Sequence, residues 1–295
     1  MQQRLVVDIE TRYYEDLASF GSNIEALITM GEVDWKRYHY NDFINSFPTV
    51  EMKFVAIYLA ASVLFLSENL CISMLSKKIF PIVEKIRDSS DIFFVVMQGE
   101  DINVVDSGFV FTRIIRRITG LVENKYYKSL DQIFEMTSLG RTVEIILVDD
   151  IMATGDQFND MFTRPRRNQL GEEFTIGQMV ERGLLKIRYY PILCTEAALE
   201  RYDQYDQYIS PCIILDHTYN ILNNIDAYFP QWLCDQIDIL STVQAMCELK
   251  SIPSYGIAGH GGLGLAISFF HSTPDSTLPL LWQKDDNGIS LLERF

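Results

Sequence analysis

The sequence predicts an α/β fold in which helices cover both faces of a mostly parallel β-sheet. Two observations predict this fold class. From Asp91 onward, short apolar runs alternate with stretches in which apolar residues recur at helical spacing, a pattern typical of βαβ units. In addition, the run Val143–Val148 is apolar apart from Glu144, which is typical of a central strand buried on both faces.

The elements of the α/β part follow from local patterns. Apolar runs rich in β-branched residues predict strands at Ile92–Met97, Val143–Val148, Ile187–Leu193, Tyr208–Leu215 and Leu265–Phe270. Helical spacing between these runs predicts helices around residues 108–119, 174–184, 195–204 and 228–249.

The first 90 residues show helical spacing and few turn residues, which predicts an α-helical N-terminal cap. We expect three helices here: one with the apolar stripe Leu5, Ile9, Tyr13 and Leu17, one that opens at Thr49 and includes the buried run Phe54–Leu66, and one over Leu70–Arg87. The domain boundary is placed at Ser89–Ser90, so residues 1–90 form the cap and residues 91–295 the α/β domain.

Composition limits the classes of function. With 25 Lys and Arg against 40 Asp and Glu, the net charge of −15 repels nucleic acid and acidic membranes, so nucleic acid is expected only through a partner. The five cysteines are widely spaced without a zinc-site pattern, which is typical of a reduced, cytoplasmic protein. No leader segment is visible, and Phe54–Leu66 is far shorter than the ~20 residues of a membrane span.

The most informative motif follows the central strand. Asp149 and Asp150 come directly after Val143–Val148, so both carboxylates are expected at the carboxyl end of a strand. Open α/β sheets bind ligands at that edge, where loop N–H groups and the next helix receive phosphates. The run Ala153-Thr154-Gly155 supplies a small-residue loop, in which Gly155 allows a positive φ and the Thr154 hydroxyl adds a donor.

From Ile145 to Gly155 the chain resembles the type I phosphoribosyltransferases, whose signature is four apolar residues, an acidic pair, two apolar residues and a Thr-Gly loop. The resemblance implies that Asp149 and Asp150 bind the ribose hydroxyls and that Ala153, Thr154 and Gly155 hold the 5-phosphate. Two departures follow at Asp156 and Gln157, where the family has a small and a hydroxyl residue. The carboxylate of Asp156 repels a phosphate unless it turns outward as a helix N-cap.

A second segment, Phe269–Trp282, contains Thr277-Leu278-Pro279-Leu280-Leu281-Trp282 and resembles the ending of phosphoribosyltransferase-like proteins of bacterial conflict and antiphage systems, including retrons. Gly155 and Gln157 are consistent with that branch. The alternative for this segment is a Pro-rich turn leading to an apolar edge strand. The resemblance implies an antiphage effector with a protein partner such as a reverse transcriptase.

For activity, the resemblance implies a ligand with a ribose 5-phosphate, either phosphoribosyl diphosphate or a nucleotide, Mg²⁺ as cofactor, and cleavage or transfer at ribose C1. The alternative is a catalytically degenerate fold that acts as a nucleotide sensor or docking subunit of a retron-type complex. Asp156 and Gln157 favour that alternative because they weaken a phosphate loop.

The sequence signals for residues that bind the diphosphate are weaker than those for the ribose and its 5-phosphate. Ser107 and Gly108 follow the first predicted strand, where the family has its pyrophosphate loop, and Arg113 is a candidate phosphate contact. The alternative is a Ser-Gly turn that opens an ordinary basic helix. Residues 120–140 occupy the position of the family's mobile loop over the reaction centre.

Four further features have both a functional and a structural interpretation. The cluster Arg164–Arg167 is either an anion site or a solvated loop. The glycines of residues 259–264 match a dinucleotide motif but lack its strand-before, helix-after context, so a flexible loop with His260 as a candidate contact is expected. His217, at a strand end, is a candidate acid–base residue. Asp8 and Glu10 resemble a nuclease motif without companions and are expected on the first helix.

Overall fold

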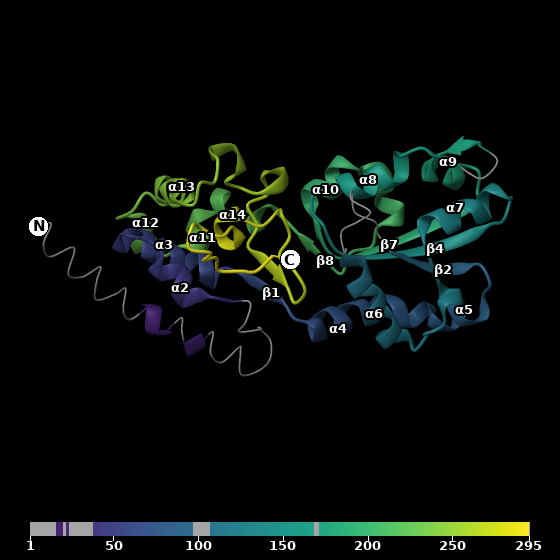
Figure 1. The fold of residues 1–295 in the computed structure, drawn as a ribbon, viewed down its shortest axis with the longest axis horizontal. Coiled ribbons are helices and arrows are strands. Elements are labelled where there is room, and N and C mark those ends of the chain that lie inside the picture. The colour runs from purple at the N-terminus through teal and green to yellow at the C-terminus, as the bar shows by residue number, and fades with distance from the viewer. Residues whose placement is uncertain (1–15, 20–21, 24–37, 97–106, 168–170, 295) are drawn as a thin grey trace, which may run out of the picture. The chain divides into compact units, whose positions relative to one another are not determined.

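The structure is a computed structural model that describes residues 16–19, 22–23, 38–96, 107–167 and 171–294 (Figure 1). The predicted stripe of Leu5, Ile9 and Tyr13 and the nuclease-like Asp8 and Glu10 lie outside the described residues. No described helix is both long enough and apolar enough to span a bilayer.

The chain divides into two compact units. Unit 1 combines residues 1–68 with residues 217–295, and unit 2 is the stretch 69–216 between them. This division differs from the expected boundary at Ser89–Ser90. The helices after Glu68 belong to the unit that holds the main sheet, whereas the C-terminal residues assigned to the α/β domain belong with the helices near the N-terminus.

Unit 2 is built on a five-stranded parallel sheet, which confirms the predicted α/β class. Its strands are β2 (Ile92–Val96), β3 (Tyr127–Lys128), β4 (Val143–Met152), β7 (Leu185–Thr195) and β8 (Ile213–Leu215). The spatial order is β3-β2-β4-β7-β8. A separate antiparallel pair joins β5 (Arg166–Arg167) to β6 (Glu173–Phe174).

Helices cover both faces of this sheet (Figure 1). One face packs on α7 (Leu130–Ser138), α8 (Asp156–Thr163), α9 (Ile176–Glu181) and α10 (Glu196–Arg201). Figure 1 shows the opposite face with α4 (Glu68–Ile79), α5 (Val83–Asp88) and α6 (Ser107–Thr119). Short 3₁₀ turns occupy Phe80–Ile82, Asn124–Tyr126 and Asp203–Tyr208.

Local chemistry explains these helices. In α6, Phe111, Ile114, Ile115 and Ile118 are buried at the spacing of one helical face, while Arg117 is exposed. Both α7 and α9 begin with a capping box in which a hydroxyl and a Gln side chain satisfy main-chain N–H groups.

The helix predicted over Leu70–Arg87 is broken into α4 and α5. Pro81 lacks an N–H donor and stands in the 3₁₀ turn between them.

Residues 120–140 do not form a loop over the site. After Tyr126 the chain enters β3, which pairs with β2 at the edge of the sheet, and then α7. The Ser129 capping box and the buried Leu130, Ile133 and Phe134 explain why these residues form a packed helix.

Unit 1 is mainly helical. Its elements are α2 (Tyr40–Asn45), α3 (Val50–Ala61), β1 (Leu64–Leu66), α11 (Ile225–Tyr228), α12 (Gln231–Cys234), α13 (Ile239–Leu249), β9 (Ile267–Phe269), α14 (Pro279–Trp282) and 3₁₀ turns at His217–Tyr219, Ile221–Asn223, Ser254–Gly256 and His260–Gly262. The Thr49 hydroxyl caps α3 as the sequence predicts. The run Phe54–Leu66 is not one helix, because its last residues form β1 and pair in parallel with β9.

The segment Phe269–Trp282 has a structural role in unit 1. The Thr277 hydroxyl donates to the Ile267 carbonyl (2.8 Å), and the Trp282 indole N–H donates to the Thr277 carbonyl (3.0 Å). The segment leads into α14 rather than into an edge strand, and the predicted strand Leu265–Phe270 joins β1 instead of the main sheet.

The glycine loop of residues 259–264 packs on this segment. The His260 N–H donates to the Asp275 carbonyl (2.9 Å), and a Cβ at Gly259 would lie 2.7 Å from the Thr277 carbonyl oxygen. The loop is therefore tied by main-chain contacts rather than left flexible, and a strand follows it, as predicted.

Candidate functional site

The order of the strands defines a crevice at one edge of the sheet. From β2 the chain proceeds to the outer strand β3 and returns to β4, and from β4 it proceeds in the other direction to β7 and β8. The carboxyl ends of β2 and β4 thus form a topological switch point, which is where open α/β sheets bind ligands. The last β2 residue, Val96, pairs with Val148, so Asp149 and Asp150 stand just beyond that pair.

Strand β4 does not end at the acid pair, as the sequence predicted, but continues to Met152. Pairing with β7 carries it on, since Ile151 lies opposite Leu193 and Met152 opposite Cys194. Because side chains alternate along a strand, the two acids point to opposite faces. They therefore have different surroundings.

Asp149 is buried, with only 2% of its surface exposed. Its carboxyl accepts hydrogen bonds from the Tyr189 hydroxyl (3.1 Å) and from the Asp150 N–H (3.0 Å). Burial raises the pKa of Asp149 well above its usual range, and the neighbouring charge of Asp150 raises it further. Asp149 is therefore a buried carboxyl whose surroundings favour its neutral form, rather than an exposed ligand.

Tyr189 links this acid to the helix that follows the loop. Its ring stacks on Phe158 of α8 with centroids 5.0 Å apart and planes at 9°. Both rings are almost fully buried. The contact fixes the position of the Tyr189 hydroxyl, and through it that of the Asp149 carboxyl.

Asp150 is only half-buried, and its carboxyl accepts the Ile151 N–H at 2.7 Å. Of the two acids, Asp150 is therefore the better placed to meet a ligand at the sheet edge.

The loop after β4, residues 153–155, is held by hydrogen bonds of Thr195 at the end of β7 and of its own residue Thr154. The Thr195 hydroxyl at the end of β7 donates to the Ala153 carbonyl (2.5 Å) and accepts the Ala198 N–H (3.0 Å), so one residue caps α10 and supports the loop. The Thr154 side chain accepts the Asp156 N–H (3.3 Å). Gly155 has φ +79° and is the N-cap of α8.

Gly155 has a neighbour that the sequence did not reveal. A Cβ at this position would lie 2.6 Å from Cδ2 of Tyr202, so the close approach that glycine permits is to this ring. Tyr202 stands just after α10 and stacks on Tyr205 with centroids 6.0 Å apart. Glycine is thus required at position 155 for two reasons: it adopts the left-handed conformation of the turn, and it leaves room for Tyr202, which follows α10.

Asp156 adopts neither of the expected positions. It is the first residue of α8 rather than its N-cap, and its carboxylate is held by two residues at the end of α10. The Tyr202 hydroxyl donates to it at 2.7 Å, and the Arg201 guanidinium lies 3.0 Å away. Hydrogen bonds lower the pKa of Asp156. The bond from Tyr202 has the largest effect, and those from Thr154 and Arg201 have smaller ones. Gln157, in the same turn, is exposed.

The candidate diphosphate residues lie on α6. Ser107 and Gly108 are its first two residues, and the exposed Arg113 is in its second turn. Helix α6 packs against β2 and β4, so its N-terminus follows the same sheet edge. Residues 97–106, which join β2 to α6, lie outside the described residues.

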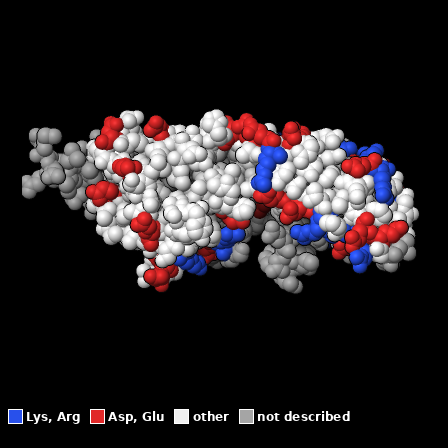
Figure 2. Space-filling model, turned by 90° about the horizontal axis from the view of Figure 1, so that it is seen from above, with Lys and Arg blue, Asp and Glu red and all other residues white. Residues whose placement is uncertain are grey.

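The remaining candidates are separate from this site. Arg166 and Arg167 form ion pairs with Asp131 and Glu173, 2.7 and 2.6 Å apart, which fits a structural hairpin better than an anion site. In Figure 2 the blue side chains of the visible face lie mostly beside red ones, and other red side chains have no blue neighbour.

The two candidate histidines belong to unit 1, whereas the acid pair belongs to unit 2. His217 begins a 3₁₀ turn and its carbonyl accepts the Asn224 side chain (2.8 Å), while His260 belongs to the glycine loop.

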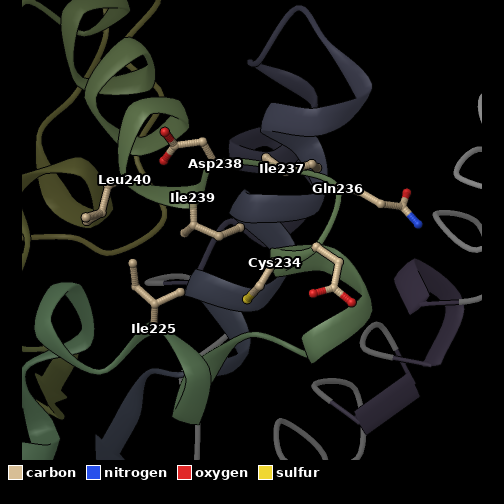
Figure 3. Close-up of a pocket in the computed structure, with 8 residues that line it drawn as sticks. Ile225, Cys234, Gln236, Ile237, Asp238, Ile239 and Leu240 are labelled. Carbon is tan, nitrogen blue, oxygen red and sulfur yellow. The ribbon is translucent and has the colours of Figure 1, made fainter.

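A shallow depression of about 440 Å³ lies in unit 1, lined by Ile225 and residues 234–240. Figure 3 shows Ile225, Cys234 and Ile239 facing a common space, with Gln236 turned away. The depression contains none of the residues of the acid pair or loop, and its walls lack the convergent polar groups of a ligand site. The edge of the sheet at Asp149 and Asp150 is therefore the better candidate for a ligand site.

Comparison with known proteins supports the phosphoribosyltransferase-like fold. The PRTase-CE family model matches residues 40–294, which includes β4, the acid pair, the following loop and the segment Phe269–Trp282. No curated protein matches the chain. Because the family match extends over most of the sequence and the sheet has the expected parallel architecture, the chain belongs to the PRTase-CE family and is a phosphoribosyltransferase-like protein.

Proposed function

We propose that the chain binds a ligand with a ribose 5-phosphate, phosphoribosyl diphosphate or a nucleotide, and cleaves or transfers at ribose C1. One observation carries the proposal. At the switch point between β2 and β4, strand β4 runs through Asp149 and Asp150 directly into a loop whose left-handed Gly155 caps the next helix. This arrangement places a carboxylate for hydroxyl groups, that of Asp150, a few residues before N–H groups for a phosphate.

The two acids have unequal roles in this proposal. Asp150 accepts hydrogen bonds from the ribose hydroxyls, while the loop Ala153–Gly155 and the first turn of α8 receive the 5-phosphate. Asp149 binds the Asp150 N–H and so fixes the main chain beneath Asp150. Catalysis then rests on holding C1 in position and stabilising the positive charge that develops there.

Mg²⁺ fits the chemistry of this edge. Mg²⁺ is commonly held by one or two carboxylates together with substrate phosphates, and Asp150 offers such an oxygen. Among the described residues no cluster of three His, Cys, Asp or Glu side chains could hold a metal alone, so ligand oxygens would complete the coordination. The ion would neutralise charge on a departing diphosphate.

Isothermal titration with phosphoribosyl diphosphate, ribose 5-phosphate and AMP, each with Mg²⁺, tests the binding proposal. We expect at least one of them to bind and Asp150→Asn to abolish that binding. The matched control is Asp226→Asn, which removes one exposed carboxylate from unit 1 and should bind as wild type does. If no ligand of the panel binds the wild type, or if Asp150→Asn binds equally well, the proposal is wrong.

We further propose that the chain is an effector of a bacterial antiphage or conflict system, a role supported by the resemblance of Phe269–Trp282 to proteins of such systems. Expression of the chain alone should then arrest growth or deplete a nucleotide pool, and Asp150→Asn should do neither. Equal growth arrest by the Asn variant would contradict an enzymatic effector.

A second function is favoured by the burial of Asp149. Since this acid already binds Tyr189 and the main chain, the site has one ligand-facing acid where active transferases use two. A degenerate site of this kind suits a nucleotide sensor or a docking subunit of a retron-type complex with a reverse transcriptase. Ligand binding without turnover, together with full antiphage protection by Asp150→Asn, would favour this function.

A further inference from the structure

The first turn of α8 and the end of α10 are joined by a cluster of three side chains. The Asp156 carboxylate accepts the Tyr202 hydroxyl (2.7 Å) and pairs with the Arg201 guanidinium (3.0 Å). Arg201 also lies over the Tyr202 ring, 5.1 Å from its centroid. We call these three residues the loop-rim cluster.

The position of the cluster is fixed by the loop itself. The Tyr202 ring lies against Gly155 so closely that no side chain fits there. Tyr202 also stacks on Tyr205, whose hydroxyl donates to Asn159 of α8 (3.1 Å). Arg201 is therefore held beside the N-terminus of α8 even though 57% of its side chain is exposed.

The charge at Asp156 requires such a neighbour if the loop takes a phosphate, a premise that rests on the proposed function. A carboxylate in the first turn lies within a few ångströms of an anion bound to the N–H groups of that turn, and like charges at that distance repel. We propose that Arg201 cancels the charge of Asp156 and thereby gives the loop its affinity for a phosphorylated ligand. Arg201 is a positioning and charge-compensating residue, which acts through Asp156 rather than on the ligand.

This proposal makes the effect of Arg201 conditional on Asp156. With Asp156 present, Arg201→Gln leaves an uncompensated carboxylate close to the proposed phosphate position. With Asn at position 156, Arg201 has no charge to cancel, so its loss has little effect. If Arg201 instead contacted the phosphate directly, its loss would weaken binding equally in both backgrounds.

A double-mutant cycle on the full chain tests the proposal, with the dissociation constant of ribose 5-phosphate as readout. Relative to wild type, we expect Arg201→Gln to raise Kd about five- to tenfold, a range that allows for the solvent screening of these half-exposed groups. Adding Arg201→Gln to Asp156→Asn should change Kd less than about twofold. The matched control, Arg182→Gln, removes an exposed arginine that lies over Phe174 of β6 and should bind as wild type does.

The possible outcomes are distinct. An unchanged Kd for Arg201→Gln, or an equal loss in both backgrounds, overturns the charge-compensating role while leaving the proposed function intact. Failure of the wild type to bind any ribose phosphate overturns the proposed function and this inference with it. Melting temperatures recorded alongside should shift little for Arg201→Gln, because an exposed ion pair contributes little to stability.

Discussion

Substitution of Asp149 tests whether this carboxyl is a neutral part of the core. Asp149→Ala removes the acceptor of the buried Tyr189 hydroxyl and of the Asp150 N–H. Leaving a buried donor unsatisfied costs about 1–3 kcal/mol, so we expect Asp149→Ala to lower the free energy of unfolding by about 2–4 kcal/mol. Asp149→Asn keeps the shape and one acceptor of a neutral carboxyl, and should cost about 1 kcal/mol near pH 4.

The same substitution predicts a dependence on pH. Burial raises the pKa of Asp149 above the value in the unfolded chain, which is about 3.9, so the native state retains a proton that the unfolded chain loses. The stabilisation of the native state by this retained proton is fully present below about pH 4. It is lost as the pH rises through the pKa of Asp149 in the native state. Relative to wild type, Asp149→Asn should therefore gain at most about 1.4 kcal/mol per pH unit above pH 4, and then level off.

Hydrogen exchange of core amides in β4 is the suitable assay, because it reports the opening of unit 2. Trp232 and Trp282 belong to unit 1, so their fluorescence would report the other unit. Asp226→Asn, an exposed control in unit 1, should show no such dependence. A stability difference between wild type and Asp149→Asn that stays constant from pH 4 to pH 9 would refute the neutral carboxyl.

Two further predictions concern stability. Gly155→Ala should lower the free energy of unfolding, measured in urea, by about 1–3 kcal/mol, because φ is +79° and the new Cβ would lie 2.6 Å from Tyr202. Adding Tyr202→Ala to this variant should recover part of the loss, because it removes the ring that the new Cβ meets. Ser276→Ala should be neutral or stabilising, because the buried Ser276 hydroxyl has no hydrogen-bond partner among the described residues. Thr277→Val should lower the free energy of unfolding by about 1–2 kcal/mol, because it loses the bond to Ile267. Equal effects at positions 276 and 277 would contradict the second prediction.

Much of the fold could be predicted because the central strands are buried on both faces. Such strands are almost continuously apolar, and β2, β4 and β7 were found for that reason. The lengths of β4 and β7 were underestimated, since polar residues at the end of β4 remain paired with β7. The parallel pair β1–β9 was missed because its strands are about 200 residues apart and local pattern carries no information on pairing over that separation.

The candidate site was predicted in part for a similar reason. Asp149, Asp150 and the loop are consecutive residues, so a local motif identified them. Their partners are remote in sequence: Tyr189 is 40 residues from Asp149, and Tyr202 is 46 residues from Asp156. The spatial adjacency of β4 and β7 brings these residues together, and a single sequence does not encode it locally. The sequence offered only one signal for Arg201 and Tyr202. Both follow the predicted strand Ile187–Leu193, so they come after its carboxyl end, at the same edge of the sheet as the acid pair.

The division of the chain also has a consequence for its synthesis. Unit 2 is complete once residue 216 has been made, whereas unit 1 must wait for residues 217–295, which supply β9 and α13. At about 5–20 residues per second, the ribosome needs on the order of 4–16 s for that stretch. During this interval the apolar side chains of α3, among them Phe54 and Leu59, lack the C-terminal residues that bury them. The nascent chain therefore holds the complete sequence of unit 2 and the still uncovered apolar residues of α3 at the same time, so we expect α3 to be a segment that a chaperone can bind.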